Sequence, residues 1–470
     1  MHVCIIGTGA AGWMTAFSLK NLNEISKITI IGSPSIPTIG VGESTTNQFY
    51  DFVNDLFPDD DRAFYKFLVD IDAAVKYGVF YKNWSHKDFL HAFVGSHFNN
   101  LNGYILGNLP ESCNENHYMM PMYDEIINEN AFNLAQGIQN YTFQFDANKF
   151  IAAMEKLADK EEKIYHIKDT VIDSEFENDE LSIKSLYLEE NGTITADYYV
   201  SCIGQTAFNQ KIMNDEYDDY SDILLTDKAL FYPLPYTDKR KEFHPYTTAK
   251  TMKYGWRWIT PTWSRIGTGY AFSSKYISVD QAIDEFTDDI GDKTIEPFTT
   301  DFFPRRIKKV FKENYCSIGM AAGFLEPLDA PGLAMTNSSI GILKDVIHQK
   351  INIKNANLVA RNKFDGWTSF ILHQYKTSER NDTQFWVDQK NVSFYRYDEI
   401  MDELKDPSTR AKQYEKAMFY HTSAGKGHRW ETLIKEPPPQ KKSLDKNREE
   451  VIEYMDNHFD FFNRIHGKLE

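Results

Sequence analysis

The sequence predicts an α/β (α+β) fold with a Rossmann-like nucleotide-binding unit at its N-terminus, a β-rich middle and a helical end. Three observations lead to this prediction. A short apolar strand runs directly into a glycine-rich turn, two later apolar strands also end in glycine, and helical patterns fill the chain beyond residue 346. At roughly 150 residues per domain, a chain of 470 residues is long enough for one large enzyme body with insertions.

The first predicted unit is a strand, turn, helix and strand in immediate succession. Residues 2–6 are apolar, residues 7–12 read GTGAAG, a helical pattern covers about 13–22, and a second apolar strand covers 28–31. This is the context in which G-x-G-x-x-G binds a dinucleotide. An accidental glycine turn is the weaker alternative.

Each glycine of this turn has a separate physical task. Gly7 permits the tight turn, Gly9 lets the backbone approach a pyrophosphate, and Gly12 allows the helix to pack closely on the strand. The free N–H groups at the N-terminus of the following helix would attract the phosphates.

One polar contact typical of such units is missing. Gly32 stands where an acid normally ends the second strand and binds the ribose hydroxyls, so we expect looser cofactor binding. Either Ser33 substitutes weakly for the acid, or ribose recognition is lost. The next segment, residues 37–45, contains Gly40, Gly42 and Glu43, and reads either as a loop over a cofactor or as an ordinary turn.

Two further strands point to the same crevice. Residues 198–204 and 315–319 each read as a buried strand that ends in a glycine turn. In an open α/β sheet such strand ends converge where ligands bind. The sequence has no second G-x-G-x-x-G in a strand–helix setting that could bind NAD(P)H.

Composition excludes several functional classes. Lys and Arg number 51 against 68 Asp and Glu, a formal charge of −17, which argues against nucleic acid and anionic membranes as partners. No segment has the ~20 apolar residues of a bilayer span, and the N-terminus does not read as a secretory signal. Four scattered cysteines suit neither a disulfide framework nor a zinc cluster. We therefore expect a cytoplasmic protein without a metal centre.

Several segments, taken in order, resemble the flavin-dependent halogenases, the family that includes the tryptophan halogenases. Together with the glycine turn, they span residue 1 to about residue 390. They are the segments IGVGE at 39–43, VKYGV at 75–79 with Asn83-Trp84, GWRWITP at 255–261, AGFLEPLDAPGL at 322–333, and the run from His373 to Trp386.

The resemblance implies the FAD-binding flavin monooxygenase/halogenase fold, with a mixed β-sheet on the substrate side. It also implies FAD, supplied as FADH2 by a separate NAD(P)H flavin reductase, with halide and O2 as co-substrates and a small indole- or phenol-type aromatic substrate. The cofactor contacts it implies are Gly7, Gly9, Ala10, Ala11, Gly12, Gly40, Gly42, Glu43, Val171 and Leu333.

Lys76 is the residue whose interpretation the resemblance changes most. Spacing alone favours a surface lysine whose stem lies over apolar neighbours. In the family, the lysine at this position handles hypohalous acid, either by hydrogen-bonding it or by forming a haloamine. A desolvated lysine with a lowered pKa suits both tasks.

Trp256 and Trp258 stand two residues apart on a strand-like stretch and are expected on one face of it. Core packing explains such a pair equally well. The resemblance implies that they line the active site between flavin and substrate. Thr260 stands where the family signature has isoleucine.

The loop around Asp329 departs most from the family pattern, which runs Pro-Leu-Glu-Ser-Thr-Gly at this point. Asp329 replaces the glutamate and, by resemblance, could take the ring proton, although a loop aspartate is more often a turn residue. The halide of the family lies against the two backbone N–H groups that correspond to Pro331 and Gly332. Because proline has no N–H, we expect a weaker halide site that favours bromide and iodide over chloride.

We expect residues 1–345 to form the flavin-binding body, with a β-rich substrate-side portion at about 222–304, and residues 346–470 to form a helical region on the substrate side. The last helical pattern, from Val451 to Phe462, could pack on the body, cover the substrate pocket or form a homo-oligomer contact. Thr260, Pro331 and Met320 depart from family or flavoprotein patterns and keep open an aromatic monooxygenase of the same fold. Gly32 and Met320 keep open a non-catalytic flavin-binding protein.

Overall fold

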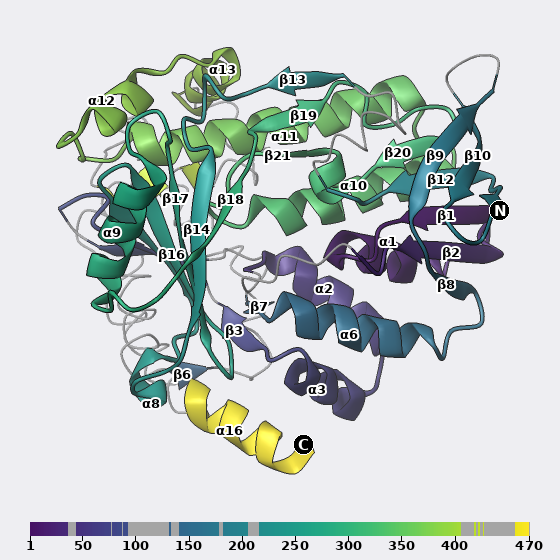
Figure 1. The fold of residues 1–470 in the computed structure, drawn as a ribbon, viewed down its shortest axis with the longest axis horizontal. Helices are drawn as coiled ribbons and strands as arrows, with labels where there is room; N and C mark the ends of the chain where they lie inside the picture. Colours follow the sequence, from purple (N-terminus) through teal and green to yellow (C-terminus); the bar gives the residue numbers. More distant parts are fainter. Residues whose placement is uncertain are drawn as a thin grey trace.

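Two sheets form the framework of the protein (Figure 1). The computed structural model describes residues 1–35, 44–76, 78–86, 88–92, 131–132, 141–177, 182–204, 216–405, 418–419, 422–423, 426 and 456–469. The chain therefore has the predicted mixture of helices with parallel and mixed sheets.

The first sheet is parallel and contains the N-terminal strand. Its strand order is β20-β12-β1-β2-β8, and its members are β1 (His2–Ile6), β2 (Lys27–Gly32), β8 (Ile164–Lys168), β12 (Tyr198–Ser201) and β20 (Tyr315–Ser317). Residues 3–6 of β1 are buried on both faces, as a central parallel strand requires. The helices that pack on one another beside it are α1 (Ala10–Leu19), α6 (Ala147–Ala158) and α10 (Pro331–Ile347).

The expected convergence of strand ends is confirmed. Strands β1, β12 and β20 are neighbours, and the glycine that follows each has a positive φ, at 109° for Gly7, 80° for Gly204 and 68° for Gly319. Helix α1 begins at Ala10 and not at residue 13 as predicted, because the glycine turn leads directly into its first turn with Gly9 as N-cap.

The second sheet has seven strands in the order β18-β14-β17-β16-β15-β4-β5. Its pairs are antiparallel except for β15 with β4. The strands are β4 (Gly78–Lys82), β5 (Phe89–Ala92), β14 (Lys228–Leu234), β15 (Thr247–Met252), β16 (Gly255–Pro261), β17 (Ile266–Phe272) and β18 (Phe298–Asp301). Helix α9 (Val279–Ile290), which starts at a capping box of Ser278 and Gln281, covers the outer face (Figure 1).

Smaller sheets and further helices complete the part of the chain that the structure describes. The strands are β3 (Ala74–Lys76) with β7 (Thr142–Gln144); β9 (Val171–Phe176), β10 (Ile183–Leu188) and β11 (Thr193–Ile194); β13 (Tyr217–Asp219), β19 (Arg305–Ile307) and β21 (Gly323–Phe324); and β6 (Ala131–Phe132) with β22 (Asp456–Asn457). The remaining helices are α2 (Asn47–Leu56), α3 (Asp61–Asp70), α8 (Lys239–Glu242), the 3-10 helix η2 (Gly319–Ala321), α11 (Ile353–Lys376), α12 (Gln384–Asn391), α13 (Tyr395–Lys405) and α16 (His458–Leu469).

The end of the chain differs from the predicted helix. Residues 451–455 lie outside the described residues, Asp456–Asn457 form strand β22, and the helix starts only at His458.

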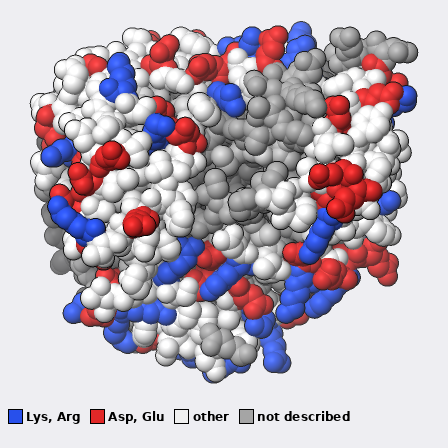
Figure 2. Space-filling view, viewed as in Figure 1, with Lys and Arg blue, Asp and Glu red and all other residues white. Residues whose placement is uncertain are grey.

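None of the helices among the described residues is long and apolar enough to cross a membrane. The face drawn in Figure 2 carries both acidic and basic side chains on the described residues.

Candidate active site

The glycine turn has the shape that a dinucleotide phosphate requires. A Cβ on Gly12 would lie 1.9 Å from the Gly7 carbonyl oxygen, and one on Gly7 would lie 2.7 Å from that of Cys202, whereas a Cβ on Gly9 would meet nothing within 4 Å. The turn is thus packed against the protein backbone at Gly7 and Gly12 and has open space beside Gly9. No side chain caps the start of α1, so the N–H groups of Ala10 and Ala11 remain for an anion.

The missing ribose acid has a structural reason. A Cβ on Gly32 would lie 2.2 Å from Thr8 Oγ1, so the Thr8 side chain occupies the place of any side chain at the end of β2. Ser33 Oγ instead bonds Thr170 Oγ1 at 2.9 Å and Ser35 Oγ at 3.0 Å.

The other residues expected at the cofactor lie in different places. Val171 follows Thr170 and is buried in a small core that also contains residues of β1, β2 and β10, and Leu333 is buried in the first turn of α10. Gly40, Gly42 and Glu43 lie outside the described residues. The contacts of all these residues with flavin stay predictions.

Lys76 is completely buried, so its alternative interpretation as a surface lysine is wrong. It ends β3 and stands opposite Thr142 of β7, and its Nζ donates a hydrogen bond to the Thr45 carbonyl oxygen at 2.7 Å. Thr45 Oγ1 in turn bonds Thr142 Oγ1 at 2.7 Å. Burial lowers the pKa of Lys76 to about 7, against the opposing attraction of the Asp329 carboxylate.

Asp329 is also buried, and the hairpin that follows the lysine strand binds it. The Tyr81 hydroxyl of β4 donates a hydrogen bond to Asp329 Oδ2, and His91 Nδ1 of β5 lies 3.5 Å from Oδ1. Asp329 and Ala330 both have a left-handed backbone, with φ of 63° and 59°. Such strain in two successive residues that are not glycine is typical of a loop with a functional constraint.

Pro331 and Gly332 open helix α10, with Pro331 at N1. A proline at N1 costs the helix nothing, because that N–H would have no helical partner, but it removes one donor from the site. Gly332 and Leu333 follow with N–H groups that the helix cannot satisfy. A Cβ on Gly332 would meet nothing within 4 Å, so the start of α10 is open toward an anion.

Trp256 and Trp258 lie on one face of β16 with ring centroids 6.0 Å apart, which confirms the prediction. Arg257 points to the opposite face, where it pairs with Asp289 of α9 at 2.8 Å. Trp256 is buried, and its indole Nε1 donates a hydrogen bond to Glu326 at 3.1 Å.

Glu326 is a site residue that the sequence reading missed. Its carboxyl group has no exposed surface and accepts hydrogen bonds from Trp256, from Thr226 at 2.5 Å and from Tyr375 of α11 at 2.9 Å. Burial raises its pKa to about 7, although these donors oppose the shift. The signal was a charged residue inside the apolar run at 322–328.

The sequence does not predict Lys426 as a site residue either, because it stands between two glycines that form no dinucleotide motif. It is buried, and its Nζ donates to Gln374 Oε1 at 2.6 Å, to the Gln374 carbonyl oxygen at 3.1 Å and to Thr377 Oγ1 at 2.9 Å. The same amine lies 5.4 Å from the centroid of the Tyr81 ring. Lys426 and Lys76 both interact electrostatically with Asp329.

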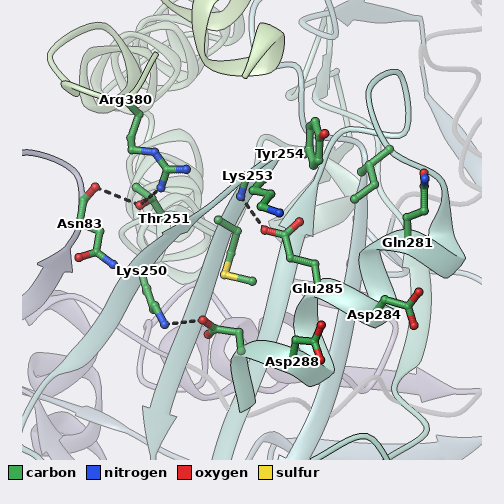
Figure 3. Close-up of a pocket in the computed structure, with 13 residues that line it drawn as sticks. Asn83, Lys250, Thr251, Lys253, Tyr254, Gln281, Asp284, Glu285, Asp288 and Arg380 are labelled. Atoms are coloured by element: carbon green, nitrogen blue, oxygen red, sulfur yellow. Dashed lines mark hydrogen bonds and ion pairs between the residues drawn. The ribbon is translucent and has the colours of Figure 1, made fainter. Parts of the chain in front are cut away.

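A pocket of about 710 Å³ lies on the other face of the seven-stranded sheet, between β15, α9 and Arg380 (Figure 3). Several of its charged groups are bonded within the protein: Lys250 pairs with Asp289 at 2.5 Å, and Glu285 accepts the backbone N–H of Lys253 at 2.7 Å. None of the predicted site residues lines it. We therefore place the candidate active site around Lys76 and Asp329.

Comparison with known proteins identifies the family to which the chain is similar. The family model described as tryptophan halogenase matches residues 2–427. The tryptophan 6-halogenase ThaL of Streptomyces albogriseolus is 27% identical over 448 residues, which cover 86% of this chain and 80% of that protein. The tryptophan 7-halogenase RebH of Lentzea aerocolonigenes is 27% identical over 427 residues, covering 83% of this chain and 79% of its own.

Solved structures show the same fold. A tryptophan halogenase from Shewanella frigidimarina superposes with a TM-score of 0.85 at 21% identity and covers 100% of this chain and 98% of its own. Tar14, a flavin-dependent tryptophan C-6 halogenase from taromycin biosynthesis, superposes with a TM-score of 0.84 at 23% identity and covers 99% of both chains.

Proposed function

Because the chain belongs to the tryptophan halogenase family, we propose that it is an FADH2- and O2-dependent halogenase of a small, electron-rich aromatic compound of the indole or phenol type. The observation that supports this best is the environment of two buried groups from distant parts of the chain. Lys76 and Asp329 attract one another in the interior, and the hairpin β4–β5 links the strand of one to the loop of the other.

The glycine turn would hold FAD by its phosphates, through the N–H groups at the start of α1. Bound as FADH2, the flavin would supply two electrons that activate O2, and O2 would be the oxidant that converts halide to hypohalous acid, with FAD and water as the other products. The chain offers no second dinucleotide motif for NAD(P)H, so a separate reductase would deliver the reduced flavin.

Lys76 would bind the hypohalous acid in the dry interior and present its halogen to the substrate. With a pKa of about 7, its amine is partly neutral at physiological pH. It can donate a hydrogen bond to hypohalous acid, or attack the halogen so that the halogen–oxygen bond breaks and water leaves with one amine proton, giving a haloamine. Asp329 would take the proton from the ring carbon that gains the halogen. Burial of both groups keeps water away, which limits escape of free hypohalous acid.

The start of α10 would bind the halide through the Gly332 N–H, while Pro331 contributes no donor. A site with fewer donors compensates less for the loss of hydration. Bromide and iodide shed water more readily than chloride and should be favoured. Competition assays in which chloride is strongly preferred would overturn this preference.

The test is turnover by the purified protein with FAD, NADH and a separate flavin reductase. A panel of indoles and phenols is offered with chloride, bromide or iodide, and products are analysed by mass spectrometry. Halogenated product supports the proposal and ranks the halides. A halide-independent gain of one oxygen would identify an aromatic monooxygenase, and flavin binding without any product would point to a non-catalytic flavoprotein.

A further inference from the structure

The strand that carries Lys76 is held on both edges. One edge of β3 pairs with β7, where Val75 stands opposite Phe143. On the other side, the Val75 N–H donates a hydrogen bond to Nε2 of His458 at 3.2 Å. His458 is the first residue of α16, so a side chain from the end of the chain occupies the place of a neighbouring strand's carbonyl group.

Only one protonation state and tautomer of the His458 ring fits its hydrogen-bond partners. Its Nδ1 lies 3.1 Å from the Phe243 carbonyl oxygen, which can only accept, so Nδ1 carries the hydrogen and Nε2 accepts from Val75. Burial lowers the pKa of His458 to about 3, so the ring stays neutral. The ring also stacks on that of Phe243, at 4.3 Å and an interplanar angle of 5°.

Helix α16 is anchored independently of this hydrogen bond. Arg240 of α8 bonds both carboxylate oxygens of Asp460 at 2.9 Å, and Phe462 is fully buried. His466 stacks on the Trp263 ring at 4.5 Å. Figure 1 shows the helix running below β3 and α3, with which it is in contact. The family model ends at residue 427, so this helix lies beyond the part of the chain that defines the family.

We propose that His458 is a positioning residue for Lys76, through which the C-terminal helix fixes the backbone of the lysine strand. Lys76 directly follows Val75, so a shift of β3 at Val75 displaces the amine from the Thr45 carbonyl oxygen and from Asp329. This inference rests on the proposed function for its catalytic consequence. The hydrogen bond itself can be tested without turnover.

The first test is amide hydrogen exchange at Val75 in the protein without flavin. His458→Phe keeps the stacked ring and removes the acceptor, while His466→Phe makes the same change two turns along the same helix. We expect exchange at Val75 to accelerate about five- to tenfold in His458→Phe, corresponding to one lost hydrogen bond, and to stay at the wild-type rate in His466→Phe. Equal exchange in all three proteins would overturn the proposal, as would equal acceleration in both variants.

The second test compares halogenated product with hypohalous acid that escapes and is captured by an added trap. His458→Phe should lower the ratio of product to trapped hypohalous acid with an unchanged KM for the aromatic substrate, and His458→Gln, which retains an acceptor and a donor, should restore part of it. An unchanged ratio in His458→Phe would contradict a positioning role. If the wild type yields no halogenated product, the proposed function fails, and the exchange experiment alone still decides whether His458 holds the strand.

Discussion

Glu326 and Asp329 lie three residues apart in one loop, and both are buried, yet their surroundings differ in kind. Among the residues that the structure describes, the groups that donate hydrogen bonds to Glu326 are the neutral side chains of Thr226, Trp256 and Tyr375. Asp329 is bonded by the Tyr81 hydroxyl, lies beside His91 and is attracted by two buried lysines, Lys76 and Lys426.

The difference assigns different tasks to two similar side chains. A buried carboxyl group without a cation holds its proton, which is why the pKa of Glu326 rises to about 7, and it is suited to fixing Trp256 in the wall of the site. Asp329 interacts with the Lys76 amine, so its position, and not its basicity, suits it to accept a proton from a substrate held at that amine. The environment, and not the residue type, separates the structural acid from the candidate base.

The largest contrast is expected in turnover. Asp329→Asn removes the proton acceptor and should lower kcat for halogenation by about 10²- to 10⁴-fold, the usual contribution of a general base. Glu326→Gln keeps the shape and most hydrogen bonds of a group that touches no reacting atom, so we expect a loss below about tenfold. Steady-state kinetics on both variants decide this, and similar losses would remove the distinction.

The second contrast concerns stability against pH. The pKa of Glu326 rises from 4.5 to about 7 on folding, which is worth roughly 3 kcal/mol at about 1.4 kcal/mol per pH unit. The folded state holds this proton more tightly, so the contribution is fully present below pH 4.5 and is lost as the pH rises through about 7.

Urea unfolding should therefore show that the free energy of unfolding of Glu326→Gln, relative to that of the wild type, increases by roughly 3 kcal/mol as the pH rises from 4.5 to above 7. Measuring the difference between the two proteins cancels the titration of all other groups. A difference that is independent of pH would mean that Glu326 is ionised throughout.

The third contrast is the pH dependence of turnover. With a pKa of about 7 for Lys76, kcat should change with an inflection near pH 7. A rise with pH would indicate that the neutral amine forms a haloamine, and a fall that the ammonium donates a hydrogen bond. Glu326 titrates in the same range, so the inflection must persist in Glu326→Gln. If the inflection is absent in Glu326→Gln, it arises from Glu326 and not from Lys76.

The smallest effects are expected from the tyrosines, each of which bonds one of the two acids. Tyr81→Phe removes a hydrogen bond from Asp329 and should lower kcat by about five- to tenfold. Tyr375→Phe removes one from Glu326 and should change stability by about 1 kcal/mol with kcat nearly unchanged. A larger loss of kcat in Tyr375→Phe than in Tyr81→Phe would indicate that Glu326, and not Asp329, is the base.

The sequence was sufficient for the features that depend on local order along the chain. The glycine turn, the converging strand ends and the common face of Trp256 and Trp258 follow from spacing alone, and the structure has all three. The halogenase likeness followed from short motifs in a fixed order.

Features that depend on contacts between distant segments could not be predicted. Spacing placed Lys76 on the surface, because nothing near it in the sequence shows that β7 and α16 enclose its strand. The hydrogen bonds of Glu326 come from three separate elements, and Thr8 fills the space beside Gly32 only because β1 and β2 are neighbours.

The most direct test of the central claim is the product of Lys76→Met under turnover with bromide and an aromatic substrate that the wild type brominates. Methionine fills nearly the same volume and removes a buried amine, so the variant should remain folded. The account predicts that bromination falls at least about 10²-fold while reduced flavin is still consumed with oxygen. Brominated product at the wild-type rate would contradict the assignment of Lys76 as the group that delivers the halogen.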